Sequence, residues 1–170
     1  MKTKNVTLFL LLLLFAVQGF AQKDPVERLF EKYNGKEGYT TVYISSKMFS
    51  MFSQADIEDP EFNALMKNLK GIRILAQDEK DGKSPDFFEM VSRELPEDVY
   101  EELMTVSEPG QKVKFLVKEE NGKIAELLMV VGGGGDNVLI DIRGNIDLKQ
   151  ISQLSKAIKI DGLDELEKLK

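Results

Sequence analysis

"QKVKFLVKEENGKIAELLMVVGGGGDNVLIDIRG", from Gln111 to Gly144, contains the clearest structural pattern in the sequence. The dipeptide Asn121-Gly122 separates two β-rich runs, which is the strongest short-range signal for a β-hairpin. A third such run, from Asp136 to Gly144, follows four consecutive glycines. The stretch therefore predicts a three-strand antiparallel meander from Lys112 to Arg143.

The four glycines, Gly132 to Gly135, raise the question of whether the meander also binds a phosphate. In a P-loop or a dinucleotide-binding loop, the glycines lead into a helix whose N-terminus holds the phosphate. Here a predicted strand follows instead, and the lysine of a P-loop is missing. We therefore expect a tight corner without a ligand, with an anion-binding nest of backbone amides as the alternative.

Alternation along the first strand of the meander places Val113, Phe115 and Val117 on one face. An antiparallel sheet with one face on the core and the other in water has this pattern. We therefore expect the meander to bury a single face. Its other face carries mainly lysines, in the order Lys112, Lys114, Leu116 and Lys118.

Helical spacing dominates the chain before the meander. Asp24 and Pro25 suit the N-cap and the first position of a helix that ends at Gly35. A strand is expected over "GYTTVYISS" (38–46), which is rich in β-branched and aromatic residues, and Asp59-Pro60 divides the next apolar segment into two short helices. The remaining expected elements are a strand from Gly71 with a polar turn to Ser84, a helix from Asp86 to about Leu95, a helix from Pro96 that carries Val99, Leu103 and Met104, and a closing helix from Asp147 to Ala157.

Together these elements predict a single α+β domain over residues 22–170, with a short charged C-terminal end. We expect a mixed, mainly antiparallel sheet of about five strands, with the helices concentrated on one face. The C-terminal part is expected to be the three-strand meander followed by a helix. A domain of this size buries a sufficient core without disulfides.

The N-terminus has the pattern of an export signal. Lys2 and Lys4 precede an uncharged, leucine-rich stretch, and Gly19-Phe20-Ala21 supplies the small residues that a signal peptidase reads. We expect a cleavable signal peptide over residues 1–21, a periplasmic or secreted protein, and no stable membrane insertion after cleavage. An uncleaved anchor is the alternative, because the apolar run approaches the ~20 residues that span a bilayer. Since the chain has no cysteine, it is not expected to be a lipoprotein.

Composition excludes several classes of function. The net charge is −6 at pH 7, and the basic residues are scattered among acids, so neither nucleic acid nor an anionic membrane is an expected partner. The chain contains no cysteine and no histidine, which excludes thiolate nucleophiles, histidine-based dyads and the usual zinc sites. We therefore expect no catalytic, cofactor-binding or metal-binding residues.

One group of residues is a candidate partner surface, namely Met48, Phe49, Met51 and Phe52. Methionine-rich faces adapt their shape to different partners. Stripes of methionine and aromatic residues on a helix also form hydrophobic cores. The sequence leaves open whether this face is core or partner surface.

Two charged groups are weaker candidates. Asp141 and Arg143 lie two positions apart on one face of a predicted strand and could form a catalytic pair, but an exposed ion pair on a solvated sheet face is favoured. Asp78, Glu79 and Asp81 resemble part of a calcium-binding loop. Because they lack the spacing of such a loop, a solvated turn is favoured there too.

The order of the expected elements, together with "VLIDIRGNIDLKQISQL" from Val138 to Leu154, resembles domain of unknown function 4252. This is a family of small exported proteins typical of the Bacteroidota. The resemblance covers essentially all of residues 22–170, implies an α+β fold, and carries no catalytic residues. Members of such families are often lipoproteins, and this chain lacks the cysteine that a lipid anchor requires.

These features favour an exported envelope protein that binds a protein or peptide partner without catalysis, in envelope signalling or stress response. The alternative is a small hydrolase or transferase that uses two carboxylates converging in a cleft. An exposed apolar patch without such a cleft favours the first function.

The export signal can be tested directly. Two arginines placed between Leu8 and Leu14 should trap the precursor in the cytoplasm, because they disrupt the apolar centre that the export machinery reads. N-terminal sequencing of the exported wild-type protein should begin at Gln22. A product that still begins at Met1 would identify the segment as a membrane anchor.

Overall fold

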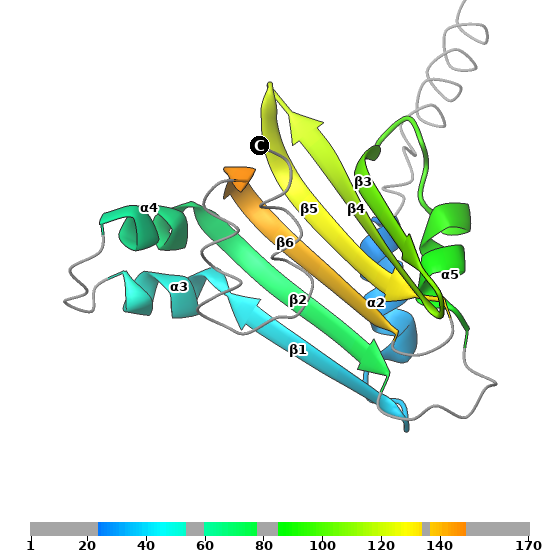
Figure 1. Cartoon of the computed structure of the whole chain (residues 1–170). Helices are drawn as coiled ribbons and strands as arrows, with labels where there is room; N and C mark the ends of the chain where they lie inside the picture. The colour runs from blue at the N-terminus through cyan, green and yellow to red at the C-terminus, as the bar shows by residue number, and fades with distance from the viewer. Residues whose placement is uncertain (1–23, 54–59, 78–84, 134–136, 149–170) are drawn as a thin grey trace, which may run out of the picture.

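A computed structural model of the chain describes residues 24–53, 60–77, 85–133 and 137–148. In this part of the chain, helices and one six-stranded sheet of order β1-β2-β6-β5-β4-β3 form an α+β fold (Figure 1), as predicted. All neighbouring strands are antiparallel. The elements are α2 (Pro25–Tyr33), β1 (Tyr39–Ser45), α3 (Ser46–Phe52), α4 (Pro60–Asn68), β2 (Leu69–Gln77), α5 (Phe87–Glu94), β3 (Glu101–Glu108), β4 (Gln111–Glu120), β5 (Lys123–Gly132) and β6 (Val138–Ile146).

The strand β3 corrects one prediction. We expected a helix from Pro96, but only a turn forms there, in which the Val99 and Tyr100 amides donate to the Pro96 carbonyl at 3.1 and 3.2 Å. The chain then pairs along β4 and extends the meander to four strands, β3 to β6. Long-range pairing with β4 thus overrides the weak local helical pattern.

The hairpin between β4 and β5 confirms the turn predicted at Asn121-Gly122. Asn121 has φ 54° and Gly122 has φ 71°, and positive φ at both central residues defines a type I′ turn. Lys112 to Glu120 pair with Gly132 to Lys123, with one register shift after Lys118. The turn therefore sets the register between β4 and β5.

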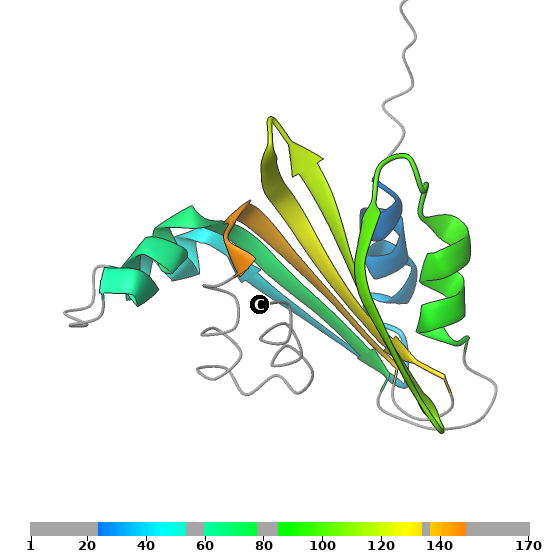
Figure 2. The ribbon, with the colours of Figure 1, turned by 45° about the horizontal axis from the view of Figure 1, so that its top comes forward.

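The sheet is buried on both faces, where we expected the meander to bury only one. The helices α2 and α5 lie beside each other on one face (Figures 1 and 2), which we call the α2–α5 face. Leu116, predicted to stand among lysines, belongs to the core of this face. The opposite face, which we call the α3–α4 face, has a core that includes Phe115, Met129 and Ile140. The strand β5 is therefore mostly apolar on both sides, whereas β4 and β6 also carry charged side chains on the α2–α5 face.

Both helices on the α2–α5 face begin at an aspartate cap. Asp24 accepts from the Val26 amide at 2.9 Å, as predicted from the sequence. Asp86 accepts from the Phe88 amide at 2.8 Å, so α5 begins one residue after its cap. These caps satisfy amides that have no partner within the helix.

The helices α3 and α4 confirm the predicted division by Asp59-Pro60, and Pro60 is the first residue of α4. They lie at the end of the sheet where β1 ends and β2 begins (Figure 1). Phe49 of α3 and Leu65 and Met66 of α4 are buried in the core of the α3–α4 face. The closing helix expected from Asp147 to Ala157 lies almost entirely outside the described residues.

The glycine tract joins the antiparallel neighbours β5 and β6, as the corner interpretation predicts. The Gly133 amide donates to Asp86 Oδ2 at 2.9 Å. A Cβ at Gly132 would clash with Asp86 Oδ1 and lie 2.8 Å from the Phe88 amide nitrogen. The start of the tract therefore also packs against the N-terminus of α5, which the sequence did not indicate.

The type I′ turn can be tested with Gly122→Val. Nothing lies within 4 Å of a Cβ built at Gly122, so the cost arises from its positive φ. Since a β-branched residue resists this conformation, the free energy of unfolding should fall by roughly 1 to 2 kcal/mol. Chemical denaturation measures this change, and Lys123→Val provides a control within the adjoining strand. Equal midpoints for Gly122→Val and wild type would contradict the assigned turn.

Candidate functional site

The densest group of charged side chains lies on the α2–α5 face, and we call it the Arg143 cluster. It consists of Asp24, Tyr100, Glu126, Asp141 and Arg143. Asp24 caps α2 and Tyr100 precedes β3, while Glu126 lies on β5 and the other two residues lie on β6. Four separate segments of the chain therefore contribute to it.

The Arg143 guanidinium is the centre of this cluster. Its Nε donates to Asp141 Oδ2 at 2.9 Å and to Oδ1 at 3.2 Å. Its Nη2 donates to Asp24 Oδ2 and to Glu126 Oε1, each at 3.2 Å. The Tyr100 hydroxyl donates to the same Glu126 oxygen at 3.3 Å. One guanidinium thus binds three carboxyl groups.

Burial of this cluster corrects the prediction of an exposed ion pair at Asp141 and Arg143. The exposed fraction is 0% for Asp141 and 3% for Glu126. The period-two pattern placed Asp141 and Arg143 on one face correctly. It did not predict that α2 and α5 cover this face. Glu126 was missed altogether, although an acid within the apolar run of β5 is a usable signal of a buried charge.

The electrostatics of the cluster favour retention of a proton. Burial, followed by the negative charge of Asp141, raises the pKa of Glu126 from 4.5 to about 7, although Arg143 lowers it in part. Burial also raises the pKa of Asp141, opposed by Arg143. Burial and the Glu126 carboxylate raise the pKa of Tyr100 far above its ordinary value, so its phenol remains a donor. A single guanidinium does not compensate three ionised carboxylates in a buried site.

A hollow of about 330 Å³ lies next to this cluster but does not open onto its carboxylates. Tyr100 forms part of its wall, together with Glu102 and Lys114, whereas Glu126 and Asp141 do not line it. Glu102 accepts from Thr105 at 2.8 Å and pairs with Lys114 at 3.1 Å, and these hydrogen bonds lower its pKa. The hollow therefore gives a substrate no access to Glu126 or Asp141, although other glutamates line it.

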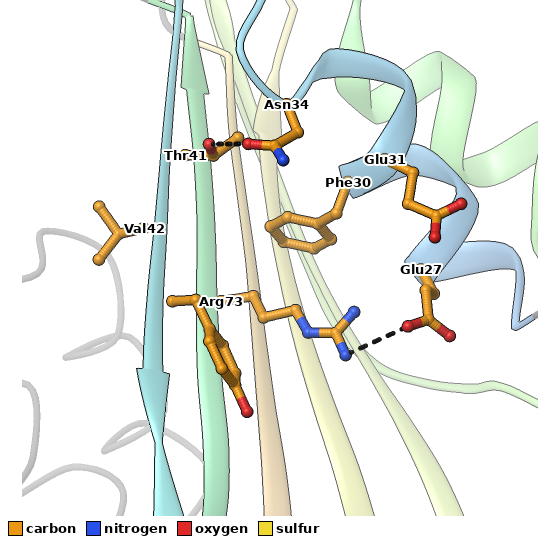
Figure 3. A pocket seen from close by; sticks show the side chains of 8 residues that line it. Glu27, Phe30, Glu31, Asn34, Thr41, Val42 and Arg73 are labelled. Carbon is orange, nitrogen blue, oxygen red and sulfur yellow. Dashed lines mark hydrogen bonds and ion pairs between the residues drawn. The ribbon is translucent and has the colours of Figure 1, made fainter. Parts of the chain in front are cut away.

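A second hollow, of about 420 Å³, lies between α2 and β1 (Figure 3). The Arg73 guanidinium lies 5.9 Å from the centres of both the Phe30 and the Tyr43 rings. It also pairs with Glu27 at 3.7 Å. On the other side, the Thr41 hydroxyl donates to the Asn34 side chain at 2.8 Å. Aromatic rings and hydrogen-bonding groups thus share one opening beside the edge of the sheet.

The four residues of the candidate partner surface divide into two groups. Phe49 is 4% exposed and belongs to the core of the α3–α4 face. Met48, Met51 and Phe52 are 46%, 59% and 43% exposed. We call these three residues the α3 surface.

Two further findings concern metal ions and membranes in the described part of the chain. The described residues contain no group of three or more Asp, Glu, His or Cys side chains placed to hold a metal ion. Nor do they include a helix long and apolar enough to cross a membrane. Asp78, Glu79 and Asp81, considered above as a partial calcium loop, lie outside the described residues.

Comparison with known proteins gives one match. A family model described as a domain of unknown function (DUF4252) matches residues 33–154. The match includes all six strands and begins at the last residue of α2. No curated protein and no solved structure matches the chain.

Because the pKa of Glu126 is raised, we expect the free energy of unfolding to fall as the pH rises. The folded chain binds an extra proton between pH 4.5 and about 7, so the stabilisation is complete below this window and is lost as the pH rises through it. Glu126→Gln removes the ionisation. Relative to wild type, this variant should therefore gain on the order of 1 to 3 kcal/mol between pH 4 and pH 8.

Urea denaturation across this pH range measures the effect. Glu108→Gln is the matched control, because Glu108 is an exposed glutamate at the end of β3. Parallel pH profiles for Glu126→Gln and wild type would contradict the raised pKa.

Proposed function

The chain belongs to the DUF4252 family, and from that premise we propose that it is a non-catalytic, exported envelope protein that binds a protein or peptide partner. Envelope signalling or stress response is the setting that we propose for this binding. The family's description names no activity, so support comes from the chain's own surface.

The α3 surface is the observation that carries the proposal. Met48, Met51 and Phe52 are spaced at i, i+3 and i+4, so they share one side of the helix. All three are large apolar residues left exposed, while Phe49 anchors the same helix in the core. Exposed apolar patches on soluble domains mark interaction sites more often than isolated apolar residues do.

The chemistry of α3 indicates the kind of partner that fits it. Lys47 is the only charged residue in this helix, and the rest are serine, methionine and phenylalanine. Thioether side chains are flexible and polarizable, so they adapt to an irregular apolar surface. Burial of such a side chain contributes roughly 1.5 to 3 kcal/mol. The expected partner therefore presents an apolar groove or patch rather than a charged one.

The alternative, a hydrolase or transferase that uses two carboxylates, has weaker support. Its requirement is a pair of acids that converge in a cleft. Glu126 and Asp141 converge, but both are almost fully buried and are held by Arg143. Because neither lines the adjoining hollow, a substrate placed there would not reach them.

Partner binding can be tested by affinity capture from the envelope fraction, with mass spectrometry of the bound proteins. The triple variant Met48→Ser, Met51→Ser, Phe52→Ser should lose the wild-type partner, since it removes the apolar contact area. Val99→Ser is the control, because Val99 is an exposed apolar residue of similar exposure, 40%, outside α3.

Folding of the triple variant is checked by circular dichroism and thermal denaturation. The same partner captured equally by the folded triple variant and by wild type would contradict the α3 surface. Loss of the partner in the Val99→Ser control as well would show that the capture is not specific to α3.

A further inference from the structure

We propose that β1 is a dimerisation edge, at which a second copy of this chain pairs its own β1 antiparallel and joins the two six-stranded sheets. This self-association goes beyond the partner binding proposed for α3 and does not depend on it.

The strand β1 is an edge of the sheet that the described residues form. Among the described strands it pairs only with β2, in continuous register from Tyr39 opposite Gln77 to Ser45 opposite Gly71. An edge strand presents a row of backbone donors and acceptors to any other strand. Proteins usually block such edges with charges, proline or a bulge. The sequence of β1, YTTVYIS, contains neither charge nor proline, and its register shows no bulge.

The strand β3, at the opposite edge of the sheet, has features that disfavour pairing with another strand. The strand β3 carries three glutamates, at positions 101, 102 and 108, and its register shifts between Glu102 and Met104. Self-pairing of β3 about Thr105 would place Glu102 opposite Glu108 of the second copy, which is unfavourable. Because β1 lacks these features, we infer that a second copy pairs with β1 and not with β3.

Self-pairing of β1 is complementary along its whole length. The register that pairs all seven residues places Val42 opposite itself at the two-fold axis and Thr41 opposite Tyr43 of the second copy. No charge then faces another charge, which matters in a chain of net charge −6. Pairs of aromatic and β-branched residues also stabilise antiparallel strands. An interface of this kind is closed by its symmetry, so it gives a dimer and not a fibre.

The hollow between α2 and β1 supplies a site for the exposed tyrosine of the second copy. Tyr43 is 66% exposed and stands beside Arg73 at the rim of its own copy's hollow, which Thr41 lines together with Asn34 and Glu27 (Figure 3). Opposite residues of an antiparallel pair share a face of the sheet, so Tyr43 of each copy stands at the other copy's hollow. Its hydroxyl can donate to the carboxylate or amide oxygens there, and the contact occurs twice.

Disulfide trapping tests the pairing and its register. The chain has no cysteine, so Val42→Cys introduces the only thiol. Opposite residues in an antiparallel pair have Cα atoms about 4.5 to 5.5 Å apart, which a disulfide spans. The full chain, expressed with its own leader, should form a disulfide-linked dimer under mild oxidation. Thr105→Cys, at the exposed centre of β3, should remain mostly monomeric. Equal cross-linking of both variants, or none in Val42→Cys, would overturn the proposal.

Sedimentation velocity over a range of concentrations tests the same edge without oxidation. Wild type should show a reversible dimer, and Val42→Lys should raise its Kd by at least about tenfold, because like charges then meet at the two-fold axis. Thr105→Lys should dimerise as wild type does. Wild type that stays monomeric at every concentration, or a peptide partner found seated on β1 of a monomer, would overturn the proposal.

The α3 triple variant separates this inference from the proposed function. It should remain dimeric although its partner is lost, and Val42→Lys should still capture that partner. Circular dichroism and thermal denaturation confirm that each variant is folded. Loss of the dimer in the α3 triple variant, with Val42→Lys still dimeric, would overturn the assignment of the dimer to β1.

Discussion

The arrangement of α2 on the sheet depends on the ion pairs that the Arg143 guanidinium forms. It binds Asp24 at the start of α2, Glu126 on β5 and Asp141 on its own strand. A buried carboxylate without a partner is strongly destabilising, so the buried Glu126 and Asp141 require the cation at this position. Tyr100 adds a fourth segment to the same network. The cluster therefore fixes how α2 lies on β5 and β6.

Both helices on the α2–α5 face are attached to the sheet in the same way. Asp24 uses Oδ1 to cap α2 and Oδ2 to accept from Arg143. Asp86 uses Oδ1 to cap α5 and Oδ2 to accept from the Gly133 amide. Asn137 adds to the second attachment by accepting from the Phe87 amide at 3.0 Å. Each cap thus orients its helix and ties it to the β5–β6 hairpin, at opposite ends of these strands.

Apolar side chains lie both in the interior of the fold and on surfaces that are available for contact. The central strands β5 and β6 contribute buried apolar residues to the cores on both faces, and their buried acids Glu126 and Asp141 are held by Arg143. Large apolar side chains remain exposed on β1 and α3, which are consecutive in the chain. A buried apolar interior next to an uncharged edge and an apolar helix fits the partner binding and the dimer that we propose. The same separation argues against chemistry at Glu126 and Asp141, because groups held for structure are not free to meet a substrate.

The sequence by itself determined the α+β class, the strand β1, the helices α2 to α5 and the β4–β5 hairpin. Their signals lie within a few residues of each other: the Asp24 cap, the break at Asp59-Pro60, the β-branched and aromatic residues of the first strand, and the Asn121-Gly122 turn. Only the tertiary structure decided that residues 101–108 form a strand, because that strand depends on pairing with β4. It also decided that Asp141 is buried and that Glu126 and Asp24 join it at Arg143. Sequence spacing places two residues on one face of a strand. Which elements cover that face depends on contacts between distant segments. Those contacts decide whether a charge is buried, and burial sets its energetic cost.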